Sequence, residues 1–333
     1  MEARDEFLPP ELLEGLGDLE WVGKMVARGL GSGIHRSPLV GRGEEFDRHQ
    51  PYQQGDDLRH LDWRLMARFD RLYVRRFRES TSVPTILVVD ASPSMDFPPK
   101  TGESASGWAS SLSKLRYAAL VAAALGHLAR EGGDIPGLAV SGGTEGAPQI
   151  LLPPRPGKER WRAVLYALDA LAPGVPASLA PLIRQVGEAV RAGGRVVILS
   201  DFLEEDGGRA VVREAGALRA RGDEVFAIRI LTPEELGEGR SKDALYQDPE
   251  DPSVAVPGSP SGDPGYRERL QAYYGALARS LEDRGVTWWE AGTTDPLLPL
   301  IRGWIRGEGS GLHGGSRLGL DLPLPRGAGR RRS

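Results

Sequence analysis

The chain has 333 residues and a formal net charge of −4, with 40% hydrophobic and 26% charged residues. This is an ordinary soluble composition, large enough for one large domain or two smaller ones, and the net charge does not favour general nucleic-acid binding. The sequence contains no cysteine, which excludes disulfides, thiol catalysis and thiolate metal sites.

The sequence also gives an expectation about location. It contains no uninterrupted apolar run near the ~20 residues that a helix needs to span a bilayer. The stretch from Met1 to Glu6 is acidic and lacks the hydrophobic core of a signal peptide. We therefore expect a cytoplasmic protein without a membrane span.

The first 80 residues differ in pattern from the rest of the chain. Within residues 7–30, leucines and valines follow a Pro-Pro-Glu start at helical spacing, which predicts one helix. Residues 33–80 then mix arginines, acids and aromatics with weak periodicity. Arginine is dense between Arg59 and Arg78 and acids lie nearby. This segment predicts an arginine–carboxylate network or, alternatively, a nucleic-acid-binding patch.

From residue 83 onward, apolar strand patterns alternate with amphipathic helix patterns. The predicted strands are Val83–Val89, Gly137–Val140, Gln149–Leu152, Arg195–Leu199, Glu224–Leu231 and Thr287–Glu290. The predicted helices are Ser113–Arg130, Trp161–Leu171, Leu179–Arg191, Ala210–Arg221, Tyr266–Arg284 and Leu297–Ile305. This order predicts an α/β fold with a doubly wound, mostly parallel six-stranded sheet, in which the 137–152 hairpin supplies an antiparallel edge strand.

These patterns divide the chain into three parts. We expect an N-terminal extension at residues 1–80, an α/β domain at 81–306 and a flexible Gly/Arg tail at 307–333. Inside the domain, the segment 237–265 is rich in Pro, Gly and acids. It predicts either an acidic lid near the strand ends or a surface insertion.

Polar side chains follow two of the predicted strands at their carboxyl ends. Asp90, Ser92 and Ser94 come after the first strand, and Asp201 ends the strand that begins at Arg195. In a doubly wound sheet with both strands central, the two aspartates approach each other at the crevice where ligands bind. Two carboxylates and two hydroxyls, completed by water, suit Mg²⁺ or Mn²⁺. Such a cation would keep enough positive charge to bind an acidic side chain of a protein partner.

This constellation resembles the metal-ion-dependent adhesion site of von Willebrand factor A domains. That family combines Asp-x-Ser-x-Ser with a Thr and an Asp from two further loops. Asp90, Ser92 and Ser94 match the first motif, and Asp201 matches the third. Ser178 stands where the family usually has Thr, and it keeps a hydroxyl. The resemblance implies a von Willebrand A-like fold and a metal held by these five residues, directly or through water.

The N-terminal part resembles the DUF58 family. The motifs that carry this resemblance are Gly33-x-His35-Arg36-Ser37, Gly43-Glu44-x-Phe46 and Tyr52-x-x-Gly55-Asp56-Asp57-x-Arg59-x-Leu61-Asp62-Trp63. The resemblance runs roughly from residue 7 to residue 306. It implies a von Willebrand A-like domain with an N-terminal extension and a link to MoxR-type AAA+ ATPases.

Other interpretations of the Asp90 loop stay open. Asp and Ser commonly cap helices and turns, so these residues could be structural. A strand that ends in Asp could also carry a phosphoryl-accepting nucleophile, but such phosphatases have Asp-x-Asp where this chain has Ser92, and no lysine obviously serves the site. We therefore predict a non-enzymatic interaction module without catalytic residues, an adaptor for a MoxR-type ATPase. The alternatives are a metal-dependent hydrolase or phosphatase, and nucleic-acid binding through Arg59–Arg78.

Overall fold

The computed structural model describes most of the predicted α/β domain and short parts of the remaining chain. The described residues are 19–30, 45–51, 65–66, 72–78, 82–98, 112–143, 148–233, 235, 245–247, 250, 253, 255–257 and 265–306. The predicted Gly/Arg tail, the first part of the N-terminal helix and most side chains between Arg59 and Arg78 lie outside these residues. The expectations about them therefore stay predictions.

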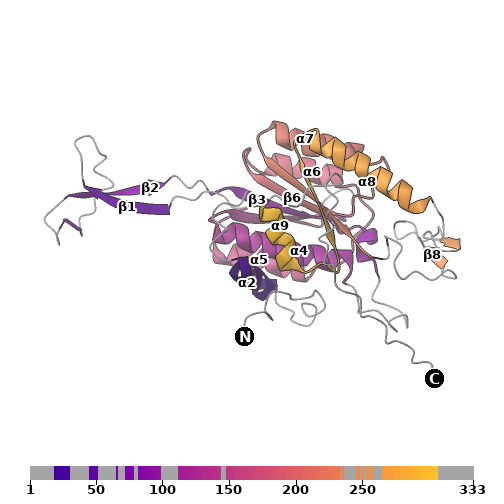
Figure 1. The fold of residues 1–333 in the computed structure, drawn as a ribbon, viewed down its shortest axis with the longest axis horizontal. Coiled ribbons are helices and arrows are strands. Elements are labelled where there is room, and N and C mark those ends of the chain that lie inside the picture. The colour runs from indigo at the N-terminus through magenta and orange to yellow at the C-terminus, as the bar shows by residue number, and fades with distance from the viewer. Residues whose placement is uncertain are drawn as a thin grey trace, which may run out of the picture.

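A six-stranded sheet forms the centre of the domain (Figure 1), in the order β10-β7-β6-β3-β4-β5. Five strands are parallel, and β5 pairs antiparallel with β4 at one edge. The strands are β3 (Pro84–Val89), β4 (Ile135–Val140), β5 (Ile150–Leu152), β6 (Arg195–Ser200), β7 (Glu224–Leu231) and β10 (Thr287–Gly292). The predicted mostly parallel α/β sheet with one antiparallel edge strand is confirmed.

The central strands are buried on both faces, as their continuous apolar sequence predicts. Ile86 and Val88 of β3 contribute to the core on one side of the sheet, and Leu87 and Val89 to the core on the other. This alternation follows from the period of two along a strand. The parallel register pairs Val89 with Val140, the last residue of β4, and with Leu199 near the end of β6, so the carboxyl ends of these three strands meet at one edge.

Helices cover both faces of the sheet (Figure 1). The seven α-helices of the described residues are α2 (Leu19–Leu30), α4 (Lys114–Glu131), α5 (Lys158–Asp169), α6 (Leu179–Ala189), α7 (Arg209–Ala220), α8 (Tyr266–Glu282) and α9 (Leu297–Arg306). Helices α2, α4, α5 and α9 share one core, and α6, α7 and α8 share the other. Trp288 and Trp289 of β10 belong to opposite cores, so both faces of this edge strand are covered.

Two short strand pairs were not predicted. The antiparallel strands β1 (Glu45–Pro51) and β2 (Tyr73–Arg78) lie apart from the six-stranded sheet in Figure 1. A second antiparallel pair consists of β8 (Leu245–Gln247) and β9 (Ala255–Pro257). Both pairs fall in segments whose hydrophobic periodicity is weak, which is the signal that sequence-based assignment needs.

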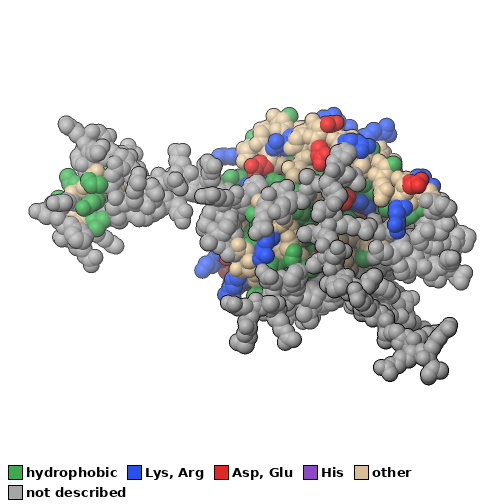
Figure 2. Space-filling view, in the orientation of Figure 1, with side chains coloured by type: hydrophobic (Ala, Val, Ile, Leu, Met, Phe, Trp, Pro, Cys, Tyr) green, Lys and Arg blue, Asp and Glu red, His purple; other side chains and the backbone are tan. Residues whose placement is uncertain are grey.

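The described surface mixes both signs of charge. On the face drawn in Figure 2, Lys and Arg side chains lie next to Asp and Glu side chains over the upper helices. No helix among the described residues combines the length and the apolar character that crossing a bilayer requires.

Candidate functional site

Asp90 lies at the carboxyl edge of the sheet, directly after β3, and is 4% exposed. Its Oδ1 accepts hydrogen bonds from the Ser92 backbone N–H at 2.9 Å and from Ser141 Oγ at 2.8 Å. Its Oδ2 accepts a hydrogen bond from Ser200 Oγ at 2.6 Å. Ser141 follows β4 and Ser200 ends β6, so the two neighbouring strands orient this carboxylate. With about four lone-pair sites on a carboxylate, these three donors leave room for a further ligand.

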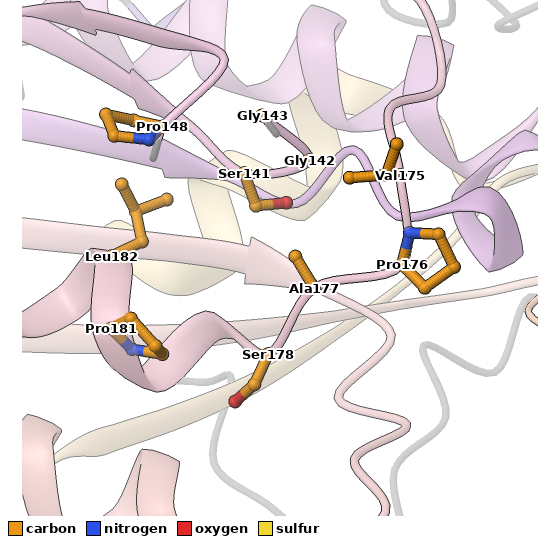
Figure 3. Close-up of a pocket in the computed structure, with 10 residues that line it drawn as sticks. All are labelled: Ser141, Gly142, Gly143, Pro148, Val175, Pro176, Ala177, Ser178, Pro181 and Leu182. Carbon is orange, nitrogen blue, oxygen red and sulfur yellow. The ribbon is translucent and has the colours of Figure 1, made fainter. Parts of the chain in front are cut away.

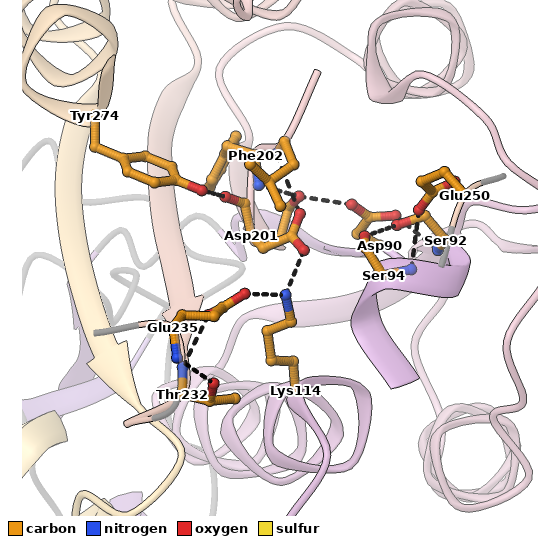
Figure 4. A network of polar contacts seen from close by, with 12 residues as sticks. Asp90, Ser92, Ser94, Lys114, Asp201, Phe202, Thr232, Glu235, Glu250 and Tyr274 are labelled. Carbon is orange, nitrogen blue, oxygen red and sulfur yellow. Dashed lines mark hydrogen bonds and ion pairs between the residues drawn. The ribbon is translucent and has the colours of Figure 1, made fainter. Parts of the chain in front are cut away.

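Ser92 and Ser94 lie close together in the loop that follows. Their Oγ atoms are 3.1 Å apart, and both side chains are buried. Pro93 begins the short 3₁₀ helix η3 (Pro93–Asp96), and the tight turn keeps the two hydroxyls near each other. The Ser94 backbone N–H donates to Oε1 of Glu250 at 2.9 Å (Figure 4), so a carboxylate already lies beside the two hydroxyls.

Asp201 follows β6 and is also buried. Its Oδ1 accepts a hydrogen bond from the Leu203 N–H at 3.1 Å, and its Oδ2 accepts one from Lys114 Nζ at 2.6 Å. The Asp201 backbone carbonyl accepts a hydrogen bond from the Tyr274 hydroxyl at 3.0 Å. Asp90 and Asp201 therefore end neighbouring strands, as the sequence predicts, but Asp201 already has a cationic partner.

That partner, Lys114, is the first residue of α4 and is 1% exposed. Its Nζ also donates to Oε1 of Glu235 at 2.6 Å (Figure 4). Burial alone would lower the pKa of Lys114, but the carboxylates of Asp201 and Glu235 outweigh burial and raise this pKa above its ordinary value. The ammonium is therefore charged at neutral pH. The expectation that no lysine serves this edge of the sheet was wrong.

Asp90 lies in a different electrostatic environment. Burial raises the pKa of Asp90 above its ordinary value, and the nearby charge of Asp201 raises it further. The hydrogen bonds from Ser200, Ser92 and Ser141 only partly oppose this change. Among the described residues Asp90 has no cationic side chain as a partner, so a bound cation would relieve the cost of its buried charge.

Ser178 caps the N-terminus of α6, where its Oγ accepts a hydrogen bond from the Ala180 N–H at 3.3 Å. Its hydroxyl also interacts with the Glu204 carboxylate, which accepts a second hydrogen bond from the Leu179 N–H at 3.0 Å. Burial raises the pKa of Glu204, and the charge of Asp90 adds to this effect. Ser178 thus has the capping role that Ser commonly takes at this position, and its role as a metal ligand stays a prediction.

The side chains at this edge that could bind a metal ion would all bind it through oxygen atoms. Within the described residues, no group of three or more His, Cys, Asp or Glu side chains is arranged to hold a metal ion. A cation here would therefore use two carboxylates, serine hydroxyls and water. This donor set suits Mg²⁺ or Mn²⁺, which bind few carboxylates and keep several waters, better than zinc, which prefers nitrogen and sulfur ligands.

The comparisons with known proteins give a family. The family model described as "Protein of unknown function DUF58" matches residues 48–254. This chain belongs to the DUF58 family. The uncharacterized protein Rv1480 of Mycobacterium tuberculosis is 32% identical to this DUF58 chain over 250 residues, which cover 74% of each protein. The uncharacterized protein Mb1516 of Mycobacterium bovis is similar to the same extent.

Two solved structures are similar to part of the DUF58 chain. The conserved hypothetical protein BatB from Bacteroides thetaiotaomicron has a TM-score of 0.40 and 15% identity, with 67% of this chain and 97% of that chain covered. An aerotolerance-related membrane protein from Bacteroides fragilis has a TM-score of 0.41 and 16% identity, with 67% and 96% covered.

Sequence reasoning missed several residues of this DUF58 site, among them Ser141, Ser200, Lys114 and Glu250. Ser141 and Ser200 lie at the ends of predicted strands, so the strand-end argument that selected Asp90 could have found them. Lys114 also left a signal, because a lysine in the first turn of a helix opposes the helix dipole and needs an acidic partner. Glu250 left only the acidic character of its segment, and the structure shows that its side chain accepts a hydrogen bond from the Ser94 N–H.

Proposed function

We propose that this DUF58 protein is a non-enzymatic, cytoplasmic interaction module with a von Willebrand A-like domain. A divalent cation, Mg²⁺ or Mn²⁺, binds at the carboxyl edge of the sheet and in turn binds an acidic side chain of a protein partner. The residues that hold the cation, directly or through water, are Asp90, Ser92, Ser94, Ser178 and Asp201. Asp90 supplies negative charge, the serines supply neutral ligands, and the cation retains net charge for the partner.

The contact between Glu250 and Ser94 carries the proposal. The carboxylate of Glu250, from a distant part of the chain, already accepts a hydrogen bond from the Ser94 N–H, with 2.9 Å between N and Oε1. The same short loop carries both serine hydroxyls and follows the buried Asp90. This edge therefore has room for a carboxylate next to a donor set that suits a divalent cation.

The nature of the partner is proposed from the resemblance of the sequence motifs. Proteins with these N-terminal motifs are linked with MoxR-type AAA+ ATPases, so we propose such an ATPase as the partner. The module then acts as an adaptor in the assembly or remodelling of other proteins. Such an ATPase would present an exposed aspartate or glutamate to the cation.

A metal-dependent hydrolase or phosphatase is the second candidate, and Lys114 is the observation that favours it. In several classes of phosphoryl-transfer enzyme a lysine binds phosphate oxygens while an aspartate holds the metal ion. However, Lys114 Nζ is buried and bonded to Asp201 and Glu235 at 2.6 Å each, so it does not face a substrate phosphate. Turnover of a generic phosphoester that requires Mg²⁺ and disappears in Asp90→Ala would replace the adaptor proposal with this one.

Calorimetric titration with Mg²⁺ and Mn²⁺ tests the metal site directly. We expect wild type to bind one cation and Asp90→Asn to lose at least about tenfold in affinity, because the amide keeps the shape but removes a ligand charge. Asp295→Asn is the matched control, since Asp295 also follows a strand of this sheet and accepts a hydrogen bond from the Gly292 N–H at 2.7 Å. Equal cation affinity in Asp90→Asn and wild type would contradict the proposal.

A capture experiment from the native host tests the partner. Immobilised wild type should retain a MoxR-type ATPase in the presence of Mg²⁺ and release it on chelation. Asp90→Ala should retain much less, while Asp295→Asn should behave as wild type. Retention of the ATPase that is indifferent to both chelation and Asp90 would show that the partner binds elsewhere.

A further inference from the structure

We propose that the partner's acidic residue is flanked by an aliphatic residue whose side chain enters a pocket next to the cation site. This inference rests on the proposed function and specifies the partner. The pocket is a partly open cavity of about 180 Å³ between the loop after β4 and the loop before α6. Its walls come from Ser141, Val175, Pro176, Ala177, Pro181 and Leu182, with Ser178 at the rim (Figure 3).

The pocket is continuous with the candidate site through two of its lining residues. Ser141 lines the pocket, and its hydroxyl donates to Asp90 Oδ1 at 2.8 Å. Ser178, a predicted ligand of the cation, lines the same pocket. A peptide that presents a carboxylate to the cation therefore places its next side chain at the opening of the pocket.

The residues that line the pocket indicate which kind of side chain it can bind. None of the ten residues that line the pocket is charged, and in Figure 3 the side chains of Val175, Ala177 and Leu182 point toward a common space. A cavity of roughly 150 Å³ is enough to hold benzene, so this partly open pocket has room for one branched aliphatic side chain beside Val175, Ala177 and Leu182. A charged side chain would lose part of its hydration there, and none of the residues that line the pocket carries an opposite charge.

The walls are held in place before any ligand binds. The Gly174 N–H donates to the Ala91 carbonyl at 2.7 Å, and the Val175 N–H donates to the Gly142 carbonyl at 3.0 Å. A Cβ atom at Gly174 would collide with the backbone of Gly142, so glycine permits this close approach of the two loops. These bonds connect the pocket wall to the Asp90 loop, which fixes the spacing between the two binding points.

Labelled peptides with one central aspartate provide the test, since the partner need not be known. The peptides carry leucine, glycine or lysine next to the aspartate, and their affinities are measured by fluorescence anisotropy in Mg²⁺. We expect the leucine peptide to bind about tenfold more tightly than the glycine peptide, because burial of an aliphatic side chain is favourable. The lysine peptide should bind no better than the glycine peptide.

Two variants and one control locate the effect. Ala177→Phe fills the pocket and should lower the affinity of the leucine peptide to about that of the glycine peptide. Val175→Thr is nearly isosteric and should reduce the difference without disturbing the fold. Tyr166→Ser removes an 82% exposed aromatic side chain on α5, outside the pocket, and should leave the difference unchanged.

Each contrary outcome has its own meaning. Equal binding of leucine and glycine peptides in wild type overturns this inference and leaves the proposed function standing. Failure of every aspartate peptide to bind in Mg²⁺ overturns both. Self-association of the wild type that disappears in Ala177→Phe would assign the pocket to a second copy of the chain and overturn the partner assignment.

Discussion

The amino and carboxyl edges of the sheet each carry a buried cation that is paired with carboxylates, but the two edges differ in their remaining charge. At the amino edge, the guanidinium of Arg195 donates to Asp134 Oδ2 at 2.7 Å and to Glu224 Oε2 at 2.8 Å. At the carboxyl edge, the ammonium of Lys114 donates to Asp201 and Glu235 at 2.6 Å each. Both cations are buried, and each has two carboxylate partners.

The two edges differ in whether a buried carboxylate remains without a cationic partner. At the amino edge, the second oxygen of Asp134 accepts a hydrogen bond from the Val83 N–H, and Glu224 is half exposed to solvent. At the carboxyl edge, Asp90 remains as a further buried carboxylate without a cationic partner among the described residues. A closed ion network suits a structural role, whereas an excess of buried negative charge suits binding of a cation. The comparison indicates a structural role for the amino edge and supports the proposed cation site at the carboxyl edge.

The largest expected effect comes from Lys114→Met. This change leaves Asp201 and Glu235 without their cation, and breaking a buried ion pair typically costs about 3–5 kcal/mol of unfolding free energy. Because the pKa of Lys114 is raised in the fold, its contribution is complete below the unfolded pKa of about 10.4 and is lost only as pH rises through the folded pKa. Denaturant unfolding at neutral pH measures the loss.

Lys24→Met provides the matched control for that experiment. Lys24 forms an exposed pair with Glu20 on α2 at 2.8 Å, and such pairs contribute less than about 0.5 kcal/mol. Added Mg²⁺ should restore part of the stability of Lys114→Met, since a cation could then neutralise Asp201 and Asp90 together. A loss as small as that of the control would mean that the Lys114 cluster is not a major stabilising element.

Arg195→Lys tests the structural role of the amino edge. A lysine retains the charge but cannot reach Asp134 and Glu224 with a planar fork, so we expect a loss of about 1–3 kcal/mol of unfolding free energy. The affinity for Mg²⁺, measured by calorimetry, should be the same as in wild type. A drop in cation affinity would contradict the separation between the two edges.

His127→Leu tests a buried ionisable group that belongs to neither network. Nε2 of His127 lies 3.3 Å from Oε1 of Glu131, and burial is the main cause that lowers the pKa of His127. Arg130 and Lys24 lower this pKa further, Glu131 raises it, and the Glu20 carboxylate also faces the ring from α2.

The sign of the pH dependence follows from this lowered pKa. Because the folded pKa of His127 lies below the unfolded value of about 6.5, the fold is favoured above that pH and loses stability as pH falls. Relative to His127→Leu, wild type should lose a measurable stability of up to about 1 kcal/mol between about pH 7.5 and 5.5. Thermal unfolding of both proteins across this pH range measures the difference in stability. Parallel curves of stability against pH for the two proteins would argue against a lowered pKa of His127.

Glu250→Gln gives the smallest expected effect. The Glu250 carboxylate accepts a hydrogen bond from the Ser94 N–H, so we expect its charge to repel the acidic side chain of the proposed partner. Removing one partly exposed charge should raise the affinity of the aspartate–leucine peptide in Mg²⁺ about two- to fivefold. Glu268→Gln, at an exposed position in the first turn of α8, is the control. A lower affinity in Glu250→Gln would mean that Glu250 helps to hold the cation.

The sequence predicted the architecture well because the buried strands of a parallel sheet appear in the sequence as continuous apolar runs. The run from Ile86 to Val89 is fully buried, and its apolar character is visible without a structure. The same argument placed Asp90 and Asp201 at one edge, since the parallel strands β3 and β6 are neighbours. The antiparallel pair of β1 and β2 escaped prediction because its residues do not alternate between apolar and polar types.

The site was predicted only in part because some of its contacts are set by tertiary structure. Glu250 reaches Ser94 across 156 positions of the chain, and nothing in the local sequence specifies this contact. Lys114 occupies the first turn of a helix, where a solvent-exposed side chain is the usual expectation, and only packing against Glu235 and Asp201 buries it. Local patterns predict elements, whereas charge pairing between distant segments requires the fold.

Phe202, which follows Asp201, makes the site sensitive to changes in the distant core. Its φ angle is 55°, a left-handed conformation that costs a non-glycine residue on the order of 1–3 kcal/mol. Its ring is 1% exposed and lies 5.2 Å from the Trp288 ring of β10, so core packing holds the backbone in this conformation. Loss of the Trp288 indole would remove that support and let the carboxylate of Asp201 turn. A substitution on an edge strand would then show itself as a binding defect in a protein that is otherwise folded.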